Sequence, residues 1–199
     1  FRDSTYGEGA AAYLYQGGTI SNCLIQYNWA TNAGSAKAGG LYFRSGGQAQ
    51  DCTIVSNWGG YYGGGVFCWF GGTISNCVLN GNTAGQGAGA DLNGGGTVVK
   101  CEIRGNIAAD GAGGVFSCSG LVQNCTISGN SAPSIGGIGI EFGGVLLDSL
   151  VSNNVAPLWG GGVRCWKGGG ITNCTIVDNL CSSNGYGGGV YLYYGGRIA

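Results

Sequence analysis

Apolar and polar residues alternate over short stretches of this chain, and Gly-Gly pairs separate many of these stretches. One kind of stretch is typified by GGVFCWFGG at 64–72, where the apolar residues Val66 and Cys68 share one parity. A second kind is typified by GGTISNCVLNGN at 71–82. Alternation with a period of two predicts short β-strands, and glycine at the strand ends predicts turns.

The second kind of stretch recurs along the chain with a cysteine, once replaced by Ser149, and an asparagine five residues later. The aligned positions are Cys23, Cys52, Cys77, Cys101, Cys125, Ser149 and Cys174, with spacings of 29, 25, 24, 24, 24 and 25 residues. The asparagines are Asn28, Asn57, Asn82, Asn106, Asn130, Asn154 and Asn179. Such a period predicts supersecondary units that stack on one another.

The first kind of stretch lies between these repeats, so that each unit contains two short strands, a bend and a Gly-rich loop. No unit contains a helix-forming stretch, which argues against a leucine-rich repeat. The period matches one coil of a parallel β-helix, whose coils are about 4.8 Å apart. We therefore expect an all-β fold, a parallel β-helix of about eight rungs of 24 to 29 residues, roughly 38 Å long.

Alternation also predicts which side chains fill the interior. The inward pairs of the first stretch are Leu41 and Phe43, Val66 and Cys68, Ile138 and Ile140, Val163 and Cys165, and Val190 and Leu192. In the second stretch Ile20, Cys23 and Ile25 point inward, which requires a corner at Ser21–Asn22. The recurrent asparagines form an internal ladder, in which each amide bonds the next rung and satisfies backbone groups.

These repeats carry a family resemblance. The phrase ITNCTIVDN at 171–179, with a Gly-Gly-hydrophobic block after each repeat, resembles the right-handed parallel β-helix repeats of pectate-lyase-like proteins. It is similar in particular to Gly- and Asn-rich versions in bacterial surface and autotransporter-type adhesins, such as polymorphic outer membrane proteins. The resemblance covers the whole chain and implies a right-handed helix. It is weak for activity, because this solenoid carries lyases, hydrolases, tailspikes and adhesins.

The chain starts and stops within a repeat, and neither end shows a polar capping segment. We therefore expect residues 1–199 to form a single β-solenoid domain, uncapped at both ends. Two explanations remain open. The chain is a segment of a longer solenoid, or it is a subunit whose last rung stacks head-to-tail on the first rung of another copy, which gives a filament.

The composition excludes several classes of catalytic site, metal site and partner. The chain has no His, so Ser-His-Asp and Cys-His catalysis and His-containing metal sites are excluded. With 8 Lys+Arg, 9 Asp+Glu and a net charge of -1, it offers no basic surface for nucleic acid. No apolar run reaches the roughly 18 residues that span a bilayer, so we expect no membrane insertion of this segment.

Ten cysteines suggest either disulfides or a metal site. Neighbours in the ladder have expected Cα separations of about 4.8 Å, short of the separation that disulfides prefer. We expect the ladder cysteines to be buried free thiols that pack as small apolar side chains. Whether cysteines of some neighbouring rungs are oxidised to disulfides stays open. Without His, zinc needs four converging thiolates, which a linear ladder does not supply, so we expect no metal and no cofactor.

The spacing of the carboxylates along the chain gives little support for catalysis. Asp91 and Glu141 share the outward face of the first stretch, but they are two rungs apart, about 9.6 Å. We interpret them as surface residues, and Lys100, Glu102 and Arg104 as a solvated charge patch. The sequence therefore predicts that the protein is not an enzyme.

Aromatic residues dominate that outward face. They are Tyr13, Tyr15, Tyr42, Phe67, Trp69, Phe116, Trp166, Tyr191 and Tyr193. In one interpretation, these rings stabilise the sheet under the neighbouring Gly-rich loops. In the other, they form an exposed stripe that packs laterally against another rod or stacks on sugar rings.

These observations favour an extracellular or cell-surface solenoid with a structural or adhesive role, part of a fibre built by rung-on-rung stacking. The alternative is a polysaccharide-binding or polysaccharide-cleaving β-helix that uses the aromatic face.

Overall fold

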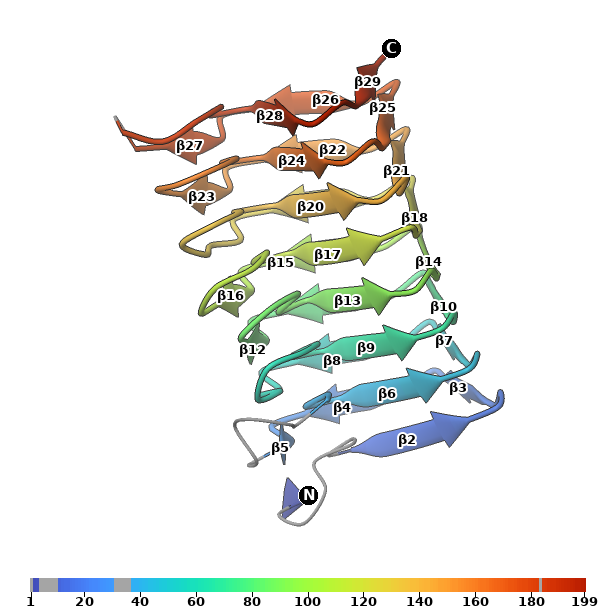
Figure 1. The fold of residues 1–199 in the computed structure, drawn as a ribbon. Coiled ribbons are helices and arrows are strands. Elements are labelled where there is room, and N and C mark those ends of the chain that lie inside the picture. The colour runs from blue at the N-terminus through green and yellow to red at the C-terminus, as the bar shows by residue number, and fades with distance from the viewer. Residues whose placement is uncertain (1, 4–10, 31–36, 183) are drawn as a thin grey trace.

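The structure is a computed structural model that describes residues 2–3, 11–30, 37–182 and 184–199. Within these residues the chain winds into a rod with three parallel sheets, and successive coils add neighbouring strands to each sheet (Figure 1). We name the sheets front, side and back after their places in Figure 1. The expected β-helix is therefore confirmed.

The front sheet has eight described strands of four residues each. They are β2 (Ala12–Tyr15), β6 (Leu41–Arg44), β9 (Val66–Trp69), β13 (Ala90–Asn93), β17 (Val115–Cys118), β20 (Ile138–Glu141), β24 (Val163–Trp166) and β28 (Val190–Tyr193). The eight described strands of the side sheet are β3 (Thr19–Ser21), β7 (Gln48–Gln50), β10 (Thr73–Ser75), β14 (Thr97–Val99), β18 (Leu121–Gln123), β21 (Val145–Leu147), β25 (Gly170–Thr172) and β29 (Arg197–Ile198).

The back sheet has seven described strands of three residues. They are β4 (Leu24–Gln26), β8 (Thr53–Val55), β11 (Val78–Asn80), β15 (Glu102–Arg104), β19 (Thr126–Ser128), β22 (Leu150–Ser152) and β26 (Thr175–Val177). Two-residue strands pair on the loop side of the rod: β1 (Arg2–Asp3), β5 (Trp29–Ala30), β12 (Thr83–Ala84), β16 (Ile107–Ala108), β23 (Val155–Ala156) and β27 (Leu180–Cys181).

Each repeat unit contains three main strands where the sequence predicts two. The second stretch breaks at the expected corner, so that it supplies both a side strand and a back strand. The residue before each ladder cysteine, or before Ser149, makes this corner with a positive φ, which L residues rarely adopt. These corner residues are Asn22, Asp51, Asn76, Lys100, Asn124, Asp148 and Asn173. Six of the seven are Asn or Asp, the non-glycine residues that tolerate this conformation best.

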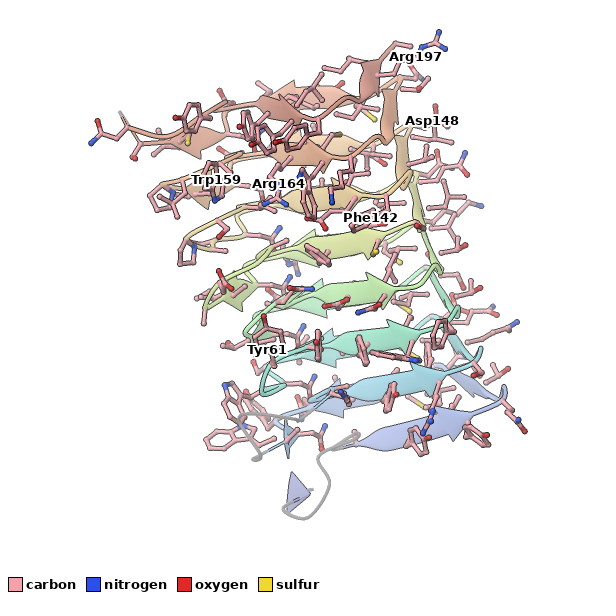
Figure 2. The ribbon with its side chains drawn as sticks, in the orientation of Figure 1. Tyr61, Phe142, Asp148, Trp159, Arg164 and Arg197 are labelled. Carbon is pink, nitrogen blue, oxygen red and sulfur yellow. The ribbon has the colours of Figure 1, made fainter. Side chains whose placement is uncertain are left out.

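The interior of the rod is a column of apolar side chains, as alternation predicts. Leu41, Phe43, Val66, Cys68 and Ile140 are fully buried. They belong to one core cluster that runs along the rod and includes inward residues of all three sheets. Figure 2 shows many other side chains projecting outward from the coils.

The asparagine ladder lies at the end of the back sheet and is confirmed. Each ladder Nδ2 group from Asn28 to Asn154 donates to the Oδ1 atom of the asparagine one coil further on, at 2.9–3.1 Å. The backbone N–H of the same residue donates to that Oδ1 atom as well. From Asn57 to Asn179, Nδ2 also donates to a carbonyl of the preceding coil. The buried amides are thereby satisfied along the rod.

The cysteine column lies at the start of the back sheet. All ten cysteines are free thiols in this structure, and Cys52, Cys77, Cys101 and Cys125 are buried. Each ladder thiol donates to the carbonyl two residues before it, at 3.1–3.3 Å. Ser149 makes the same bond to Leu147 at 2.6 Å and accepts from the Cys125 N–H at 3.1 Å. A hydroxyl therefore takes the place of the thiol because both donate and accept at this corner.

Replacement of Asn106 by Ala should lower the free energy of unfolding by about 3 kcal/mol, because buried donors of Asn82 and the carbonyl of Leu79 lose their partner. Chemical denaturation followed by circular dichroism measures this change. Asn93→Ala, at a half-buried outward position of the front sheet, is the matched control and should cost far less. Equal losses in the two variants would show that the ladder adds no special stability.

Candidate functional site

The predicted aromatic residues occupy two columns on the outward face of the front sheet. One column runs through the second residue of every front strand, and the other runs through the fourth. The first is Tyr13, Tyr42, Phe67, Asp91, Phe116, Gly139, Arg164 and Tyr191. The second is Tyr15, Arg44, Trp69, Asn93, Cys118, Glu141, Trp166 and Tyr193.

The structure combines the two interpretations of the aromatic face, because its centre is covered by loops while rings at its ends are exposed. Tyr42 and Phe67 point outward but are buried, because Ala38 and Tyr62 from the loops pack over them. The ring of Tyr62 stacks on that of Phe67 at a centroid distance of 5.0 Å. Trp69 and Phe116 are half-buried, whereas Tyr13 and Tyr15 at one end of the sheet are exposed.

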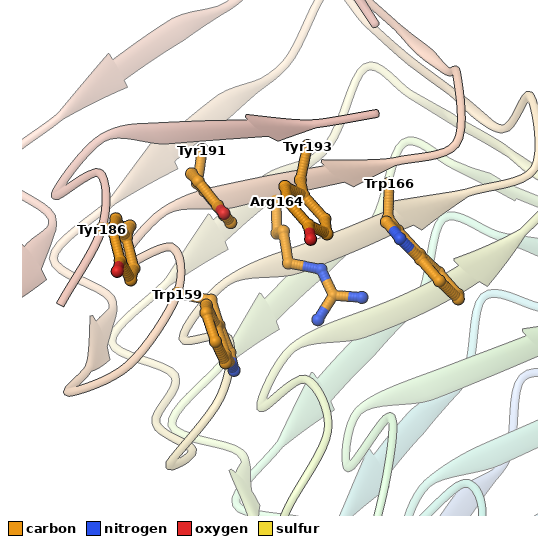
Figure 3. A pocket seen from close by; sticks show the side chains of 6 residues that line it. All are labelled: Trp159, Arg164, Trp166, Tyr186, Tyr191 and Tyr193. Carbon is orange, nitrogen blue, oxygen red and sulfur yellow. The ribbon is translucent and has the colours of Figure 1, made fainter. Parts of the chain in front are cut away.

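The other end of the front sheet holds a groove of about 540 Å³. Strands β24 and β28 supply Arg164, Trp166, Tyr191 and Tyr193, which line it. Two further aromatic residues, Trp159 and Tyr186, come from the loops before these strands (Figure 3). Figure 2 shows Trp159 and Arg164 together on the front of the rod. The sequence prediction included Trp166, Tyr191 and Tyr193 but missed the two loop residues.

A sequence signal for the missed residues exists. Trp159 and Tyr186 each stand directly before the run of glycines that leads into a front strand, and Tyr62 has the same place four coils before Trp159. A bulky residue at this point folds back over the outward face, because the loop ends where the front strand begins. The aromatic-before-glycine pattern therefore marks the residues that complete or cover the face.

Four rings of the groove stand nearly parallel. The planes of Trp159 and Tyr186 differ by 7° at a centroid distance of 5.7 Å. Tyr186 and Tyr191 differ by 25° at 5.4 Å, and Tyr191 and Tyr193 by 18° at 5.8 Å. Figure 3 shows the rings of Trp159, Tyr186 and Tyr191 on one side of Arg164, Tyr193 next to it and the Trp166 indole on the other side. The groove is thus a row of flat apolar surfaces with a cation at its centre.

Arg164 is held in the groove by two neighbours. Its guanidinium forms an ion pair with Glu141, whose side chain is almost buried, and lies 5.7 Å from the centre of the Trp166 ring. Burial raises the pKa of Glu141, and the charge of Arg164 opposes this rise. The Nε atom of Arg164 is buried without a hydrogen-bond partner among the described residues. The cation is therefore positioned with part of its donor capacity unused.

Comparison with known proteins gives the family. The family described as "Right handed beta helix region" matches residues 10–199. The chain belongs to this right-handed β-helix family. No curated protein and no solved structure matches the chain. The right-handed winding expected from the repeats is therefore confirmed, while β-helix membership alone leaves the activity open.

The two carboxyl groups considered for catalysis lie on the outward face with one strand between theirs, as predicted, but they are buried. Asp91 is fully buried and Glu141 is 5% exposed, so they are not surface residues. The Gln86 amide donates to Asp91 at 3.2 Å, and Glu141 is paired with Arg164 of the neighbouring strand β24. Strand β17, with Phe116 and Cys118, separates their strands. The structure does not bring the two carboxyl groups together in one accessible site.

Burial strongly raises the pKa of Asp91, because the charged form loses its hydration; the Gln86 hydrogen bond opposes this rise. One Asp91 oxygen has no hydrogen-bond partner among the described residues. A neutral carboxyl group fits this environment better than a carboxylate.

Other features that could hold a ligand are limited. A second hollow of about 400 Å³ lies beside Tyr27, Trp29 and Trp58 on the loop side. Within the part of the chain that the structure describes, no group of three or more His, Cys, Asp or Glu side chains is placed to hold a metal ion. The described β-helix also contains no helix long and apolar enough to cross a bilayer.

Replacement of Asp91 by Asn should make the protein more stable at neutral pH. Because the folded-state pKa is raised, the native protein binds a proton more tightly than the unfolded chain. The stability due to this group is present at low pH and is lost as pH rises from the ordinary value of 3.8 through the raised folded-state pKa. Thermal unfolding midpoints of wild type and variant should therefore agree at low pH and differ by at least about 2 °C at pH 7.

The control is Asp110→Asn, at an exposed loop position. It should not reproduce the pH-dependent difference. A difference between Asp91→Asn and wild type that does not change with pH would contradict the assignment of the buried proton to Asp91.

Proposed function

We propose that this β-helix is an extracellular adhesive solenoid that binds a glycan chain in the groove formed by Trp159, Arg164, Trp166, Tyr186, Tyr191 and Tyr193. The row of nearly parallel rings is the observation that carries the proposal. An extracellular location agrees with the ligand, since polysaccharides are abundant at cell surfaces. A structural role of the rod and adhesion through the groove are compatible.

The chemistry of the groove suits sugars. A sugar ring has an apolar C–H face, which packs on an aromatic ring, and hydroxyl groups around its edge. Tyrosine hydroxyls and the Arg164 guanidinium supply hydrogen-bonding groups beside the flat rings. The volume lies within the range of about 300–1,000 Å³ that is typical of ligand sites. Both requirements, flat apolar surface and polar edge, are thus present together.

Binding agrees with the arrangement better than cleavage. Glycoside hydrolysis needs two carboxyl groups that flank the scissile bond. Glu141 lies next to the groove but is paired with Arg164, and Asp91 is buried three strands from β24. We therefore propose recognition without bond cleavage. Head-to-tail stacking of chains stays a prediction from the sequence.

Replacement of Tyr191 or Trp159 by Ala should weaken polysaccharide binding about fivefold each, because each ring contributes on the order of 1 kcal/mol of stacking. Affinity electrophoresis in gels that contain neutral or acidic polysaccharides measures the change. The matched control is Tyr13→Ala, since Tyr13 is an exposed ring in the same column of the front sheet. It should bind like wild type.

Two results would count against the proposal. One is an absence of retardation of the wild type in every polysaccharide gel. The other is an equal loss of binding in the Tyr13 and Tyr191 variants, which would place the ligand elsewhere. Release of reducing or unsaturated sugars from the same panel would favour the cleaving alternative.

A further inference from the structure

The back sheet presents an outward face with a hollow beside Leu150 and Thr175 at one end. Its outward residues form two columns through the first and third positions of strands β4 to β26. The first column is Leu24, Thr53, Val78, Glu102, Thr126, Leu150 and Thr175, and the second is Gln26, Val55, Asn80, Arg104, Ser128, Ser152 and Val177. Except for Ser152, these residues are exposed or half-exposed, unlike the covered centre of the front sheet.

Charge on this face is confined to one strand. Among the seven described back strands, the charged residues are Glu102 and Arg104, both on β15. This strand is the middle one of the sheet order β26-β22-β19-β15-β11-β8-β4. Their side chains form an ion pair within the strand and remain 40% and 48% exposed, respectively. The strands of this face thus carry one acid and one base side by side at their centre, and Asp148 borders the face at the corner before β22.

The back face is self-complementary in charge, because it carries one acid and one base side by side. Two such faces pack with their central strands opposed when a twofold axis runs along the rod or along the strands. An axis along the rod, midway between the two columns, sets Glu102 of each copy opposite Arg104 of the other. An axis along the strands sets Glu102 opposite Glu102 and Arg104 opposite Arg104. Opposite charges favour the first arrangement and like charges disfavour the second.

Side-chain size agrees with the axis along the rod. That axis opposes the two columns at every level, so the large Leu150 meets the small, recessed Ser152 of the second copy. Val78 likewise meets Asn80, and Val177 meets Thr175. Large side chains therefore face smaller or polar ones, which permits close packing of two sheets about 10 Å apart. The net charge of -1 per chain adds little repulsion.

We propose that a second copy of this chain docks on the back sheet, with the two rods parallel and Glu102 and Arg104 paired reciprocally across the twofold axis. The contact is about 30 Å by 10 Å on strand spacing, which is small for a stable interface, so the dimer is weak. The front and back sheets lie on opposite sides of the rod (Figure 1), so the aromatic groove stays open in each copy. The proposal is independent of the glycan.

Charge reversal tests this pairing. Glu102→Arg places Arg beside Arg104 in both copies, and Arg104→Glu places Glu beside Glu102, so each variant opposes only like charges. Sedimentation velocity from micromolar to millimolar concentration should show dimer for the wild type and at least a tenfold larger dissociation constant for each variant. An equimolar mixture of the two variants should dimerise again, because it opposes Arg pairs to Glu pairs.

The control is Thr97→Arg, which changes the charge of the same coil on the side sheet and should dimerise like wild type. Circular dichroism checks that every variant is folded. A monomeric wild type, single variants that dimerise like wild type, or a mixture that remains monomeric would each overturn the proposal. Dimer in the mixture without dimer in the wild type would overturn it too, since antiparallel rods give that result.

Discussion

A parallel β-helix sets every residue directly beside the equivalent residue of the next coil, so each side-chain position becomes a column of neighbours about 4.8 Å apart. Such columns suit only residue types that hydrogen-bond or pack well with copies of themselves. The asparagine ladder meets this demand most completely, because each Oδ1 accepts from two N–H groups of one coil while the Nδ2 group reaches back to a carbonyl. The three-sided coil depends on this corner, where an interior amide replaces missing strand pairing.

Because the stacked positions are fixed, variety is confined to the loops. Their lengths change from coil to coil, and their aromatic residues decide what the front sheet exposes. Tyr62 folds over Phe67 and closes the centre of the sheet. In later coils, Trp159 and Tyr186 stand beside Tyr191 and leave a groove. The same structural device, an aromatic residue before the glycines, thus buries one part of the sheet and builds a binding surface on another.

This division explains what the sequence could predict. Period, inward residues and both ladders follow from positions that repeat, and the corner at Asn22 follows from a break in alternation. The exposure of outward-pointing residues cannot be predicted from the repeating positions, because it depends on loops whose paths are not periodic. Asp91 was therefore expected at the surface although it is buried, and the sequence left open whether loops cover Tyr42 and Phe67, as they do. Trp159 and Tyr186 were missed for the same reason, as they belong to no strand.

Columns of like residues also restrict charge. A repeated lysine or glutamate would set like charges about 4.8 Å apart along the rod, where they repel. This constraint accounts for the low fraction of charged residues, 9%, in the chain. Two opposite-charge pairs form within the sheets, within a strand for Glu102 and Arg104 and between neighbouring strands for Glu141 and Arg164. A single charge pair on such a rod is therefore isolated on a largely neutral surface. It specifies the register of a second rod packed against it, whereas a charge repeated on every coil would fit several registers equally well.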